Sequence, residues 1–154
     1  MTKITVFICN PAVSPQQNLE NFIGLCRFKL TVFGKNLYWD AESWDVSDFV
    51  KIRGRKGKVS LYWSDFTTSK QKIGPLMTAP YIDFARAYLR YSAALHPTKY
   101  LSNRLISIRA IEYSLIEITG SNDLVKADSS IFTRAAALLR EKYAPSTIYA
   151  MGRE

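Results

Sequence analysis

Helical spacing runs through nearly all of residues 76–154, and this pattern constrains the fold more than any other feature of the sequence. Apolar residues recur there three or four positions apart in four segments, which begin near Pro80, Thr98, Asp128 and Pro145. Thr98 is the expected N-cap of the second segment, His96-Pro97 ends the first, and Gly120 ends the second. Four short helices with short links predict a compact all-α four-helix bundle.

The first half of the chain shows a mixed pattern instead. The β-branched run Ile4–Ile8 predicts an edge strand, and apolar residues at helical spacing between Ser14-Pro15 and Gly34 predict a helix. Residues 37–50 are typical of strand or turn, and residues 59–63 alternate as a strand does. A hairpin is the simplest arrangement of these last two segments.

The polar segment 67–75 ends in Gly74-Pro75 and predicts a loop at a domain boundary. A chain of 154 residues suffices for one domain or two small ones, each with a core. We therefore expect a mixed α/β region in residues 1–75 and a helical domain in residues 76–154. The predicted fold class is an α+β region followed by an all-α four-helix bundle.

The chain is strongly basic, with 21 Lys and Arg against 13 Asp and Glu and a formal net charge of +8. Such an excess favours a polyanionic partner. Five of the cations fall within eight residues at the expected hairpin tip: Lys51, Arg53, Arg55, Lys56 and Lys58. Charges at this density repel one another unless an anion binds or solvent screens them. A nucleic-acid-binding tip and a well-solvated turn are both open at this point.

The residue groupings that common kinds of catalysis need are missing from the sequence. His96 is the single histidine, and no Gly-x-Ser-x-Gly motif or glycine-rich phosphate loop is present. Cys9 and Cys26 lack metal-ligand spacing and are too few for a disulfide framework, which favours a reducing cytoplasm. No apolar stretch approaches the roughly 20 residues that span a membrane. We expect no metal, no cofactor and no enzymatic activity of this chain alone.

The tryptophans and the helix faces allow two interpretations each. Trp39, Trp44 and Trp63 are more typical of a core than of a base-stacking platform. Arg86 and Arg90 share one face of the first bundle helix, where nearby acids can pair with them. The second bundle helix has a polar side that suits phosphates and base edges, although such a side is ordinarily a solvent face. Its residues are Lys99, Asn103 and Ser107, with Arg109 at the flank.

Three stretches of the second half resemble a known family. They are Pro80–Tyr91 (PYIDFARAYLRY), His96–Lys99 (HPTK) and Asn103–Glu112 (NRLISIRAIE). Together they resemble the N-terminal half of bacterial phage-type integrases of the tyrosine recombinase family. Leu30–Gly34 and Trp44–Val46 resemble the leader region of the same group. The similarity covers most of the chain.

The resemblance implies that residues near 78–154 form a four-helix, SAM-like core-binding domain, which clamps one face of duplex DNA. It also implies which residues approach the DNA. On the second helix these are Thr98, Lys99, Asn103, Ser107 and Arg109, and on the fourth they are Thr147, Tyr149 and Arg153. The basic hairpin would contact arm-type DNA sites, help to close the clamp or contact a neighbouring subunit.

The catalytic residues of that family do not appear in this chain. The family uses a His-x-x-Arg pair, whereas His96 is followed at that spacing by Lys99. We therefore expect a DNA-binding N-terminal fragment of a recombinase for DNA integration, with the catalytic domain absent and other recombinase subunits as partners of the intact protein. The alternative is a protein-interaction or RNA-binding module whose basic loop docks on an acidic partner.

Overall fold

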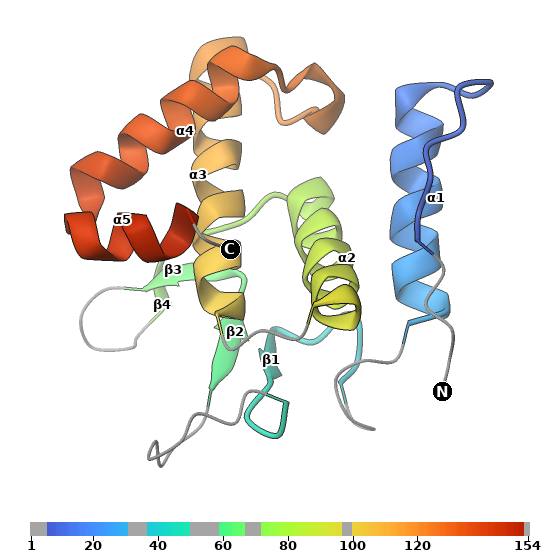
Figure 1. Ribbon diagram of the computed structural model, residues 1–154, viewed down its shortest axis with the longest axis horizontal. Coiled ribbons are helices and arrows are strands. Elements are labelled where there is room, and N and C mark those ends of the chain that lie inside the picture. Colours follow the sequence, from blue (N-terminus) through green and yellow to red (C-terminus); the bar gives the residue numbers. More distant parts are fainter. Residues whose placement is uncertain (1–5, 31–36, 50–58, 67–71, 97–99, 153–154) are drawn as a thin grey trace.

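The computed structural model describes residues 6–30, 37–49, 59–66, 72–96 and 100–152. Most of these residues are helical, with two small sheets, which confirms the expected mixture of helices and strands. The helices are α1 (Pro15–Phe28), α2 (Ala79–Leu95), α3 (Leu101–Thr119), α4 (Ser129–Lys142) and α5 (Pro145–Gly152), with a short 3-10 turn, η1 (Leu124–Lys126). Helix α2 packs against α1 on one side and α3 on the other, and α4 and α5 pack on α3 (Figure 1).

The predicted hairpin is present. Strands β1 (Ser43–Asp45) and β2 (Ser60–Tyr62) pair antiparallel, with Trp44 opposite Leu61. A second antiparallel pair follows, made of β3 (Ser64–Phe66) and β4 (Lys72–Leu76). The predicted loop over 67–75 is therefore wrong for its last residues, which belong to β4. Both sheets have two strands, so each strand has a free edge, and there Gly74-Pro75 can be accommodated within β4.

Local capping signals set most of the helix boundaries. Ser14 caps α1 through its side chain and Pro15 follows as the first helical residue, while Asp128 accepts hydrogen bonds from the amides of Ser130 and Ile131 at the start of α4. Gly120 ends α3 with φ of 67°, the left-handed conformation that glycine adopts freely. These boundaries confirm the sequence prediction. Thr98 was the wrong N-cap for α3, since Tyr100 occupies that position.

Two further boundaries in the first half differ from the prediction. Residues 6–8 form no strand, and the backbone amide of Phe7 donates to the hydroxyl of Tyr91 at 2.8 Å instead of to a strand partner. Helix α1 ends at Phe28, before the expected stop at Gly34. The reason lies outside the helix, because a side chain of α2 binds its last carbonyl groups.

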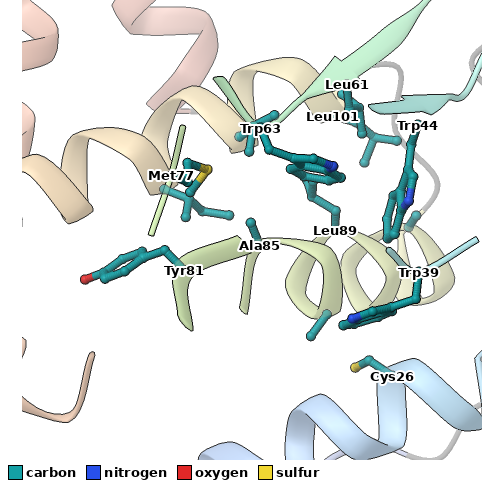
Figure 2. Packing of buried hydrophobic residues seen from close by; sticks show 14 of the residues in the cluster. Cys26, Trp39, Trp44, Leu61, Trp63, Met77, Tyr81, Ala85, Leu89 and Leu101 are labelled. Atoms are coloured by element: carbon teal, nitrogen blue, oxygen red, sulfur yellow. The ribbon is translucent and has the colours of Figure 1, made fainter. Parts of the chain in front are cut away.

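One hydrophobic cluster contains residues from both sides of Gly74-Pro75. Trp44 of β1, Leu61 of β2 and Trp63, which lies between β2 and β3, pack with Leu89 of α2 and Leu101 of α3, and none of the five is more than 1% exposed (Figure 2). Trp39 is 7% exposed and lies between α1 and α2 (Figure 2). The tryptophans are thus core residues, as the sequence favoured. Burial of these large rings attaches the strands to the helices.

Arg86 and Arg90 of α2 are buried inside this aromatic cluster. The guanidinium of Arg90 lies 5.1 Å from the ring centre of Trp39 and 5.0 Å from that of Trp44. The guanidinium of Arg86 lies 5.2 Å from the ring of Trp63 and donates to the carbonyl of Ala41 at 3.0 Å. Burial lowers the pKa of both groups from its ordinary value, but arginine remains charged in proteins. Aromatic faces and carbonyl oxygens replace the lost water around both positive charges, and the carboxylates of Asp83 and Asp40 pair with Arg86 at 3.6 and 3.8 Å.

Arg90 also terminates α1. Its Nη1 donates to the carbonyls of Cys26, Arg27 and Leu30, and its Nη2 donates to that of Leu37, all at 3.3–3.4 Å. The last four carbonyls of a helix have no partner within it, and a cation at this end also interacts favourably with the helix dipole. Each bond is long, so none dominates. Together they fix where α1 ends and where the chain turns toward Trp39.

Replacing Arg90 with alanine should therefore destabilise the whole described body. We expect Arg90→Ala to lower the free energy of unfolding by about 2–4 kcal/mol, because a buried hydrogen-bonding network is broken and its carbonyls lose their partner. Arg140→Ala, which removes an exposed cation from α4, should change it by less than about 0.5 kcal/mol. Urea unfolding followed by circular dichroism measures both. Equal stability of the two variants would contradict the role given to Arg90.

The reactivity of the two cysteines tests the packing of α1 on α2. Cys26 is fully buried beside Arg90, and burial raises the pKa of its thiol to about 12, whereas Cys9 is exposed. Because the thiolate is the reactive form, iodoacetamide at neutral pH should modify Cys9 and spare Cys26 in the folded protein. Mass spectrometry should find one adduct before unfolding and two in denaturant. Rapid modification of Cys26 in the folded protein would show that α1 does not pack on α2 in this way.

Candidate nucleic-acid interface

The positive charge of the chain is unevenly distributed. The described ranges contain 11 basic and 12 acidic residues, whereas the remaining segments contain 10 basic residues and a single acidic one. The excess of +8 therefore comes from those remaining segments, and half of their cations belong to the run Lys51, Arg53, Arg55, Lys56 and Lys58. This run lies outside the described residues. A polyanionic partner would therefore be attracted chiefly by the segments outside the described ranges, because the described ranges have almost no net charge.

The structure does describe both ends of the chain segment that contains the basic run. The amide of Val46 donates to the carbonyl of Val59 at 2.8 Å, and the amide of Val59 donates to Oγ of Ser47 at 2.7 Å. Oδ1 of Asp45 accepts from the Ser47 hydroxyl at 2.5 Å and orients it. These bonds extend the β1–β2 ladder, whose Trp44 and Leu61 are in the core. The described residues on the two sides of the run are thus hydrogen-bonded to each other.

Asn103 and Ser107 are brought together on one side of α3. Both are half-buried and line a groove of about 300 Å³. Phe84 and Tyr88 of α2, whose rings stack at 6.0 Å, and Phe132 of α4 form much of the remaining wall. The Ser107 hydroxyl donates to the Asn103 carbonyl at 3.1 Å, and Arg104, Ile108 and Ile111 of α3 complete the lining of the groove. Thr98 and Lys99, predicted for the same face, lie outside the described residues.

Arg109 lies on a different side of α3 from Asn103 and Ser107. It is 8% exposed and lines two adjoining cavities, of about 510 and about 250 Å³, together with Lys142 and Tyr143. The helical pattern places it at the flank of a polar face, whereas in the structure α3 is covered by neighbours on several sides. The neighbouring Glu112 is also buried, and its Oε1 accepts from the amide of Thr78 at the start of α2, 2.9 Å away.

The predicted residues of the last helix are less buried. Thr147 is half-buried and Tyr149 is 69% exposed on α5, which packs on α3 and α4. Arg153 lies outside the described residues. Neither the groove nor either of the two adjoining cavities has both Asn103 and Arg109 in its lining, and Tyr149 lines none of the three.

Several polar residues that sequence reasoning did not single out lie close to Arg109. They are Ser60, Tyr62 and Ser64 of the strands, Ser102 of α3 and Lys142 of α4, all of which line the smaller of the two cavities. A lysine in the last turn of a helix commonly interacts favourably with the helix dipole. The sequence therefore provides no reason to assign Lys142 a function. The serines become neighbours only through the packing of β2 on α3.

Comparisons with known proteins assign no function to this site. No family model, curated protein or solved structure matches the chain. Among the described residues, no cluster of three or more His, Cys, Asp or Glu side chains is arranged to bind a metal ion. Nor does any helix of the described ranges combine the length and apolar character that crossing a bilayer requires.

Proposed function

We propose that this chain is the DNA-binding N-terminal part of a site-specific tyrosine recombinase of the phage-integrase kind, and that it holds duplex DNA for integration and recombination. The proposal rests on the resemblance of residues 80–112 to the core-binding region of that family and on the basic character of the chain. The contacts assigned to DNA are the basic run, the start of α3 with Asn103 and Ser107, and Thr147 and Tyr149 of α5.

One observation carries the proposal furthest. The strands that flank the basic run pack at the end of the helical body where α2 ends and α3 begins (Figure 1). Ser60 and Tyr62 of β2 line the same cavity as Ser102 in the first turn of α3, and Leu61 and Leu101 share the core. The two sets of residues expected to contact DNA, in the run and at the start of α3, are therefore attached to the same end of the protein.

The described residues are nearly neutral in charge, so attraction of DNA depends on the position of the basic run. With 11 basic and 12 acidic residues, the described ranges supply little net attraction for a polyanion. The run supplies five positive charges and no negative one. In this account the run provides the phosphate contacts that dominate affinity, and the polar groups of α3 and α5 provide orientation and base contacts.

A salt titration of duplex binding tests the proposal. Each neutralised phosphate releases counterions and adds about 0.9 to the slope of log affinity against log salt concentration, so the wild-type chain should lose affinity steeply between about 50 and about 200 mM salt. Changing Arg53, Arg55 and Lys56 to alanine should lower affinity for every sequence and reduce the slope by about 2–3. Fluorescence anisotropy measures both quantities.

A matched control removes three exposed cations from other places. Lys29, Lys126 and Arg140 change the net charge by the same amount and belong to neither proposed contact set. Their joint replacement with alanine should leave most of the slope intact. Absent or salt-insensitive binding by the wild type would contradict the proposal, and an equal loss in both variants would remove the special role of the run. Tighter binding to RNA than to DNA duplex at matched salt would favour the RNA-binding alternative.

A further inference from the structure

We propose that the small cavity between the strands and α3 binds a phosphate group. This cavity, called here the β2–α3 groove, has a volume of about 250 Å³. Its polar lining comes from four separate elements and consists mainly of Ser60, Tyr62, Ser64, Ser102, Arg109 and Lys142. The proposal rests on the proposed function for the source of that phosphate, which is the DNA backbone.

Ser64 gives the first argument. The residue is 7% exposed, and its hydroxyl is buried with no hydrogen-bond partner among the described residues. Buried hydroxyls are normally paired, because the group loses its bonds to water and must regain them in the protein. An unpaired hydroxyl on the wall of a cavity is therefore well placed for an acceptor that arrives with a ligand. A phosphate oxygen is such an acceptor.

The charge of the lining gives the second argument. Arg109 is 8% exposed at the wall of the groove, and Lys142 is exposed where α4 ends. No described residue that lines the groove carries a carboxylate. A guanidinium presents two parallel donors that match two phosphate oxygens, and an ammonium adds a second positive charge. Two cations in the lining of the groove favour an anion over a neutral ligand.

The start of α3 gives a third argument. Ser102 lies in the first turn of this 19-residue helix, whose N-cap Tyr100 makes no side-chain capping bond and whose first turn contains no acidic residue. The positive end of the helix dipole is therefore not compensated by a carboxylate of its own first turn. Serine hydroxyls, a guanidinium, an ammonium and a helix start are all groups that bind phosphate, and here they meet at one cavity.

The same chemistry would also accept free inorganic phosphate, so the experiment has two arms. In the first, the full chain labelled with nitrogen-15 is titrated with inorganic phosphate, with sodium chloride at matched ionic strength as the reference. Amide shifts of Ser64, Ser102 and Arg109 are expected with phosphate and not with chloride. Ser64→Ala should weaken these shifts, and an undisturbed spectrum under phosphate would overturn the proposal.

In the second arm, duplex binding is compared among single variants. Ser64→Ala removes one hydrogen bond and should weaken binding about threefold to tenfold without changing the salt slope. Lys142→Ala should reduce the slope by about 1. Lys126→Ala, which removes an exposed cation outside the groove, is the matched control and should reproduce the wild-type affinity closely.

Thermal stability separates a ligand-binding hydroxyl from a structural one. Because the Ser64 hydroxyl has no partner in the folded protein, Ser64→Ala should keep or raise the Tm while it weakens phosphate binding. A lower Tm together with unchanged phosphate binding would show a structural role and overturn the proposal.

The outcomes also separate this inference from the proposed function. If the wild type binds duplex DNA with the expected salt dependence while the groove variants and the phosphate titration show nothing, the groove proposal fails alone. If phosphate shifts the groove amides but duplex binding is absent, the anion site stands with free phosphate as its ligand and the proposed function fails. Groove shifts together with weakened duplex binding by Ser64→Ala support both.

Discussion

The burial of Arg90 between Trp39 and Trp44 is the interaction on which the rest of the structure depends. The Arg90 guanidinium contacts two aromatic rings and donates hydrogen bonds to four carbonyls at the end of α1 and in the segment after it. It thereby joins α2 to the end of α1 and to the segment that follows α1, both of which are distant from α2 in sequence. Arg86 repeats the arrangement four residues earlier against Trp63, whose ring Nε1 donates to the same Ala41 carbonyl at 3.0 Å. This pair adds polar contacts to the apolar packing between α2 and the region around the strands.

This arrangement divides the cations of the chain into two groups with different roles. Arg86 and Arg90 are enclosed in the core, and Arg134 is engaged by Glu117 at 2.8 and 3.1 Å, so none of the three is presented to a partner as an open positive charge. The cations of the run at 51–58 have no acidic neighbour within the run. A buried aromatic and arginine core thus supports a hairpin that leads into the most basic segment of the sequence. In the proposed function, stability and DNA attraction come from different cations.

The sequence predicted those features that depend on local chemistry. Ser14, Asp128 and Gly120 cap helices through their own conformational preferences, and the alternation of residues 59–63 was enough to find β2. Features set by distant contacts were missed. The early end of α1 depends on Arg90, which is more than 60 residues away from Cys26 and Arg27, and the burial of Arg109 depends on how many elements cover α3. The grouping of Ser60, Ser64 and Ser102 with Lys142 follows from strand packing that no spacing in the sequence reveals.

In the proposed function, DNA is held at the end of the protein where the β1–β2 hairpin meets the start of α3. Hydrogen–deuterium exchange of the full chain, with and without a saturating duplex, tests it most directly. We expect slower exchange for amides of β2 and of the first turn of α3 when DNA is bound, and no change in α1, which packs on the far side of α2 (Figure 1). Protection confined to α1, or no protection under conditions where binding is saturated, would contradict it.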